Sequence, residues 1–122
     1  MESNLSAFIQ NLLHCVTNAH LLHLQSRSYA QHVALGEFYD GLDDLTDTLA
    51  ETIQGKYGLL TGYTANYDLP PTDPVAYLEQ IAGYVEASRR SGWYPQDTNI
   101  QNETDNIASL IDSTLYKLRY LS

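Results

Sequence analysis

The sequence predicts an all-α fold, a four-helix bundle in a single domain of residues 1–122 with one long connection between its second and third helices. Three observations carry this prediction. The length of 122 residues is close to that of one typical domain. Apolar residues recur every three or four positions in four separate segments, without strand-like alternation. A stretch of about fifteen residues between the second and third segments lacks that period and contains Gly and Pro.

The first two helices are predicted over residues 4–27 and 31–56. The apolar stripe of the first consists of Leu5, Phe8, Ile9, Leu12, Leu13, Val16, Ala19 and Leu24. The stripe of the second consists of Leu35, Phe38, Leu42, Leu45, Leu49 and Ile53. Gly55 and Gly58 follow this second stripe, and glycine is the residue that ends helices at the lowest conformational cost.

The last two helices are indicated by their start signals. Asp73 is predicted as an N-cap, with Pro74 at the first helical position, where proline's missing N–H is not needed. This third helix is expected to reach about Ser91. Thr98 and Gln101 have the spacing of a capping box, which predicts a fourth helix from there to the C-terminus.

The connection over residues 58–72 bears on how the helices are joined. It is longer than antiparallel neighbours need and long enough to travel the length of a bundle, which favours a bundle with one crossover. An up-down-up-down bundle with short loops is the alternative.

Charge and composition exclude several functions. Fifteen Asp and Glu against six Lys and Arg give a formal net charge of −9, and such a surface repels the phosphates of nucleic acids. No stretch approaches the roughly 18 apolar residues of a membrane span, and no basic segment precedes an apolar run at the N-terminus. We therefore expect a cytoplasmic protein that binds neither nucleic acid nor membrane. Cys15 is the only cysteine, which excludes an internal disulfide and a Cys-x-x-Cys metal site.

Three histidines of the first helix differ in their expected environments. His20 falls on or beside the buried stripe, where an imidazole needs either a hydrogen-bond partner or a metal ion. His14 lies away from the stripe and His23 lies near the helix end. Both are expected to be solvated or structural.

A polar edge is predicted along the second helix. It consists of His32, Gly36, Asp40, Asp43, Asp47 and Glu51. One interpretation is the solvated face of an amphipathic helix. The other is a set of metal ligands. Like charges one turn apart repel, which favours a bound cation, and imidazole with carboxylate suits iron, manganese or zinc. His32 and Asp47 are about 22 Å apart along one helix, too far for one ion. Two copies with antiparallel second helices would bring the two ends together and give two equivalent sites.

The spacing His20-x11-His32-x14-Asp47-x3-Glu51 resembles the ferroxidase signature of the Dps proteins, the ferritin-like mini-ferritins of starved bacterial cells. The acidic segment 42–58 and the last predicted helix are also similar to that family. The resemblance implies a ferritin-like bundle in which His20 and His32 of one subunit and Asp47 and Glu51 of its dimer mate bind iron. It further implies a ferroxidase that oxidises Fe2+ to Fe3+, usually with peroxide, and stores iron in a hollow dodecamer.

The sequence also departs from the Dps pattern. The family usually has an aspartate four residues after its second histidine, where this chain has Gly36, and Glu37 and Asp40 lie at other positions on the helix. The family's common Trp after the first histidine is Leu21, and a basic N-terminal tail is lacking. One alternative is therefore a ferritin-like bundle without ferroxidase activity, a structural or partner-binding module such as a phage or accessory protein. Another is an unrelated bundle with coincidental spacing.

Overall fold

The computed structural model describes residues 2–122 and consists of four helices. They are α1 (Glu2–Gln25), α2 (Tyr29–Tyr57), α3 (Pro74–Arg89) and α4 (Thr98–Tyr120). No strand occurs in this part of the chain. The prediction of an all-α protein with four helices is confirmed.

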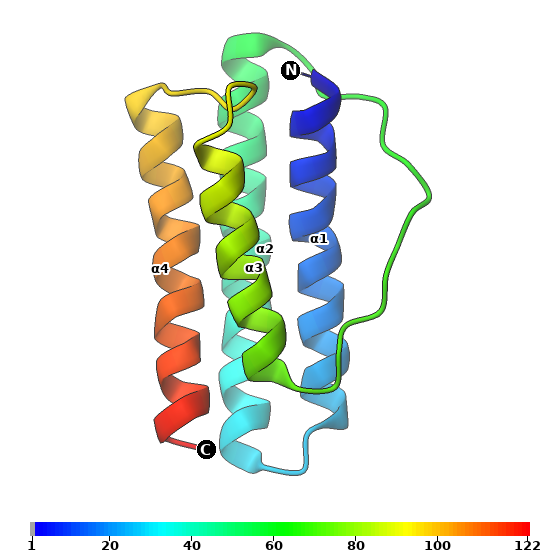
Figure 1. Ribbon diagram of the computed structural model, residues 1–122, viewed down its shortest axis with the longest axis vertical. Coiled ribbons are helices and arrows are strands. Elements are labelled where there is room, and N and C mark those ends of the chain that lie inside the picture. The colour runs from blue at the N-terminus through cyan, green and yellow to red at the C-terminus, as the bar shows by residue number, and fades with distance from the viewer. Residues whose placement is uncertain (1) are drawn as a thin grey trace.

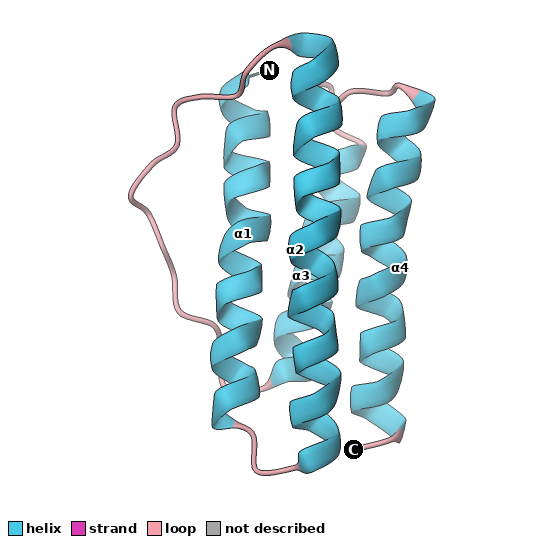
Figure 2. Cartoon of the chain, turned by 180° about the vertical axis from the view of Figure 1, so that it is seen from behind, coloured by secondary structure: helices cyan, strands magenta, loops and turns pink. Residues whose placement is uncertain are grey.

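The helices form a bundle in which α2 and α3 run in the same direction, opposite to α1 and α4 (Figure 1). Helix α1 packs against α2, α2 against α4, and α3 against α4, whereas α1 and α3 make the sparsest contact. Residues 58–73 contain no helix and pass along the outer side of α1 from one end of the bundle to the other (Figure 2). This segment therefore covers the side of the bundle where α1 and α3 are least closely packed.

The turn between α1 and α2 is shifted from its predicted place. Helix α1 ends at Gln25 rather than residue 27, and α2 begins at Tyr29 rather than residue 31. The reason is Ser28, whose side chain accepts a hydrogen bond from the Gln31 backbone N–H at 3.2 Å and so caps α2. The short turn brings the end of α1 close to the start of α2.

The predicted N-cap of α3 is confirmed, because the Asp73 side chain accepts from the Val75 N–H at 3.1 Å and Pro74 is the first helical residue. The prediction of a capping box formed by Thr98 and Gln101 is wrong. The N-cap is Asp97, whose carboxylate binds side chains of α2 instead of its own helix. The Gln101 amide donates to the Pro95 carbonyl at 3.0 Å.

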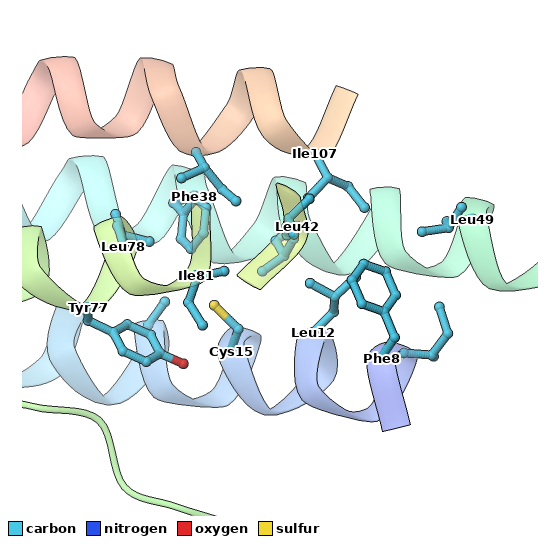
Figure 3. Packing of buried hydrophobic residues seen from close by; sticks show 14 of the residues in the cluster. Phe8, Leu12, Cys15, Phe38, Leu42, Leu49, Tyr77, Leu78, Ile81 and Ile107 are labelled. Atoms are coloured by element: carbon cyan, nitrogen blue, oxygen red, sulfur yellow. The ribbon is translucent and has the colours of Figure 1, made fainter. Parts of the chain in front are cut away.

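All four helices contribute to one hydrophobic core (Figure 3). Its fully buried side chains include Phe8, Leu12, Leu35, Phe38, Leu42, Leu49, Ile53, Leu78, Ile100 and Ile107. Those of α1 and α2 belong to the two apolar stripes that the sequence predicts for these helices. Among residues 2–122 no helix combines the length and hydrophobicity needed to cross a membrane.

Candidate functional site

The predicted histidines lie where α1 ends and α2 begins. His20 and His23 belong to the last turns of α1, and His32 belongs to the first turn of α2. The rings of His23 and His32 stack with centroids 3.6 Å apart and planes 18° apart. The His20 ring stacks instead on Tyr39, at 4.3 Å, and meets the edge of His23 at 5.9 Å. His23 therefore lies in contact with both predicted ligands.

Two reciprocal hydrogen bonds hold the stacked rings. Nδ1 of His23 lies 2.5 Å from the His32 carbonyl oxygen, and Nδ1 of His32 lies 2.8 Å from the His23 carbonyl oxygen. A carbonyl oxygen only accepts, so each Nδ1 must carry the hydrogen. In the neutral form each ring then has its lone pair on Nε2. This is the arrangement of a metal-ligating histidine, whose other nitrogen usually donates to a carbonyl or carboxylate.

The stacking limits what one copy of the chain can bind. An imidazole lone pair lies in the plane of its ring, so two nearly parallel rings cannot direct their Nε2 atoms at one ion. Among the residues that the structure describes, no group of three His, Cys, Asp or Glu side chains is arranged to hold a metal. A metal at His32 would have to draw its other ligands from elsewhere.

The structure corrects the expectation for His20. Its side chain is exposed rather than buried beside the apolar stripe, because it lies over Tyr39 on the outer surface of the α1–α2 pair. No hydrogen bond to His20 is formed within residues 2–122. The ring nitrogens of His20 are therefore without a hydrogen-bond partner in this part of the chain.

The absence of a side chain at Gly36 leaves the space that the His23 ring occupies. A Cβ atom at Gly36 would lie 3.1 Å from Cε1 and 3.2 Å from Nδ1 of His23. The glycine thus makes room for the His23 imidazole between the two helices. Sequence reasoning assigned His23 only a solvated or structural role. The signal that could have found it is a histidine near the end of one helix facing a glycine in the next.

The carboxylates of the polar edge lie on the exposed face of α2. Asp40, Asp43, Asp47 and Glu51 are all exposed. None of the ion pairs formed within residues 2–122 involves them, and Lys56, the next cation along α2, pairs with Asp97. The negative charge of this edge is therefore uncompensated in a single copy. Within that copy Asp47 and Glu51 do not meet the histidines.

Cys15 is not part of this site. It is fully buried in α1, and burial raises the pKa of its thiol to about 12 while a hydrogen bond with Tyr77 opposes that rise. A thiol with this pKa is almost wholly protonated at neutral pH.

The fold and the site define an all-helical bundle with a histidine cluster at one end and an uncompensated acidic edge beside it. A family of unknown function, DUF5856, matches residues 23–118, and the chain belongs to this family. The match includes His23, His32, Asp47 and Glu51 but begins after His20. Neither the curated proteins nor the solved structures contain a match to the chain.

Proposed function

We propose that this protein binds iron at sites shared between two copies and oxidises it, in the manner of a Dps-like mini-ferritin. The observation that carries the proposal is the His32 ring, whose Nδ1 is bonded to a backbone carbonyl so that Nε2 is left as the ligand atom. The same order of helices, with one connection that travels the length of the bundle, is found in ferritin-like folds.

The donor set fits iron in kind. His20 and His32 supply imidazole nitrogens, and Asp47 and Glu51 supply carboxylates, a combination that suits iron. Both carboxylates are exposed and form no ion pair within residues 2–122. They are therefore available to bind a metal ion together with the histidines of a second copy. Two copies with antiparallel α2 helices would form two such sites. Iron is the substrate here, and the acidic surface would attract Fe2+ to it.

A complementation experiment tests the shared site. His32→Ala and Asp47→Ala chains are each titrated with Fe2+ without oxygen, then mixed, allowed to exchange subunits and titrated again. If each site takes its histidines from one copy and its carboxylates from the other, each variant alone loses tight binding. A mixed dimer then regains one intact site. Failure of the mixture to recover any binding would contradict a shared site.

Matched controls separate ligand loss from unfolding. His14→Ala and Asp44→Asn remove an imidazole and a carboxylate outside the four predicted ligands, and both should bind iron like the original chain. Light scattering gives the size of the assembly, and peroxide added to the iron-loaded protein tests oxidation to Fe3+. A dimer or a dodecamer is compatible with shared sites. A monomer that binds no iron would overturn the proposal.

A second candidate function is a structural or partner-binding module that has the bundle but no ferroxidase site. It is favoured by the apolar side chains exposed where α1 and α4 end and α2 begins, namely Leu24, Tyr29, Tyr116, Tyr120 and Leu121. Exposed apolar groups gathered at one end indicate an interaction surface. If iron titration of the original chain gives no binding, this candidate replaces the first.

A further inference from the structure

A hollow lies on the side of α1 opposite to the histidine cluster, between α1, α3 and the connection. Its volume is about 350 Å³, within the range of small-molecule sites. Helices α1 and α3 make the sparsest contact in the bundle, and residues 66–71 of the connection form the outer wall. Nothing in the proposed iron chemistry uses this space.

The outer wall is fixed to α1 by hydrogen bonds. Asn18, which is buried, donates from Nδ2 to the Asp68 carbonyl at 3.2 Å and to the Tyr77 hydroxyl at 3.0 Å. Its Oδ1 accepts from the Tyr67 hydroxyl at 2.5 Å. Further along, the Gln10 side chain accepts from the Thr64 N–H at 2.9 Å. These hydrogen bonds fix the connection to α1 and so define the outer wall of the hollow.

The lining is rich in amides that lack partners. The side-chain amides of Asn66, in the connection, and Gln80, in α3, both line the hollow, and neither forms a side-chain hydrogen bond within residues 2–122. Asn11 donates to the Tyr84 hydroxyl at 2.8 Å, which leaves its carbonyl oxygen available. Each free amide offers a donor and an acceptor side by side.

Charge and shape restrict the ligand further. No Lys or Arg lines the hollow, and Asp68 is its one carboxylate. With a formal net charge of −9 on the chain, an anionic ligand would be repelled. Three aromatic residues, His14, Tyr77 and Tyr84, also belong to the lining, so a flat ring in the hollow would lie beside aromatic side chains.

We propose that this hollow binds an uncharged nucleobase-type heterocycle, as a free base or nucleoside. Asn and Gln side chains pair with the adjacent donor and acceptor of such rings, as they do with adenine in DNA recognition. Aromatic side chains supply the surface on which an unstacked base is commonly bound. The volume holds one ring system rather than a polymer, which agrees with a charge that excludes nucleic acid.

The test is a titration of the full chain with adenosine, guanosine, cytidine and uridine, followed by NMR or calorimetry. At least one nucleoside should bind saturably and weaken about tenfold in Gln80→Ala and in Asn66→Ala, the amount expected for one lost hydrogen bond. The 5′-monophosphate of that nucleoside should bind more weakly than the nucleoside. Both side chains are exposed, so neither variant should unfold.

The control variant is Asn106→Ala, which removes an exposed amide of α4 away from the hollow and should bind like the original chain. No saturable binding by any of the four nucleosides would overturn the proposal. So would equal affinity in the original chain and both hollow variants, or binding of glucose where no nucleoside binds. None of these results depends on iron, so the two proposals fail separately.

Discussion

Helix α1 packs against α2 on one side and against α3 on the other, and the polar side chains of the two contacts differ. Toward α2, a short turn brings the helices together, and the His23 and His32 rings each donate a hydrogen bond to the other residue's backbone carbonyl. Toward α3, a non-helical connection fills part of the gap and leaves amides such as Asn66 and Gln80 without partners. The first side holds its polar groups in a fixed arrangement. The second side has polar groups to offer a ligand.

The side facing α3 nevertheless depends on one large apolar contact. Phe8 is fully buried and its ring lies 5.6 Å from Tyr84 and 5.2 Å from Tyr94, centroid to centroid. We expect Phe8→Ala to lower the free energy of unfolding by ~3–5 kcal/mol, because it leaves a cavity among these rings. Urea unfolding measures the change, and Thr17→Ala, on the exposed face of α1, should alter it little. A loss below ~1 kcal/mol for Phe8→Ala would mean that α3 closes over the gap.

The same side should also make the fold sensitive to alkaline pH. Burial raises the pKa of Cys15 from 9.0 to about 12, and it raises the pKa of Tyr77 as well. From about pH 9 the unfolded chain therefore loses protons that the folded chain retains, so stability falls as the pH rises towards 12. Each such group contributes a slope of at most ~1.4 kcal/mol per pH unit.

Urea unfolding at several pH values checks this dependence. Replacement of Cys15 by Ala should make the decline above pH 9 shallower, while the part of the Tyr77 pKa rise that comes from burial remains. The comparison uses the slope with pH, because the substitution also changes packing. A stability that is constant from pH 9 to 11 would contradict the prediction.

The sequence predicts what depends on periodicity and misses what depends on the segments between helices. The helices follow from apolar stripes such as Leu35 to Ile53, and the start of α3 follows from Asp73. The role of His23 was missed, because the period within one helix does not show that the tight turn before Tyr29 places this ring against Gly36. The hollow could not be predicted either, because the course of residues 58–73 follows no repeating pattern.

The metal site stays a prediction, and the structure shows where its residues lie in a single copy. His32 has the environment of a ligand, whereas His20 is exposed and its ring lies on Tyr39. Spacing along the sequence places residues on a helix face but does not say which ring occupies the space between two helices. Here that ring belongs to His23, and Gly36 is the residue that admits it.

The pair of Gly36 and His23 gives the finest test of the contrast between the two sides of α1. Alanine stabilises a helix interior relative to glycine by ~0.5–1 kcal/mol. At Gly83, on α3, a new Cβ meets nothing within 4 Å, so Gly83→Ala should show this gain. At Gly36 the Cβ would lie 3.1 Å from the His23 ring, which would have to give way by a few tenths of an ångström while it stacks on His32.

We therefore expect Gly36→Ala to be less stable than Gly83→Ala by ~1–2 kcal/mol, the usual range for mild overpacking. In a His23→Ala background the conflict is absent, so adding Gly36→Ala should recover the gain seen at Gly83. Thermal or urea unfolding of the original chain, the two single variants at Gly36 and His23 and their double variant closes this double-mutant cycle, with Gly83→Ala as the reference. If Gly36→Ala is already stabilising while His23 is present, the ring moves freely, and the fixed polar arrangement inferred for the α2-facing side of α1 is wrong.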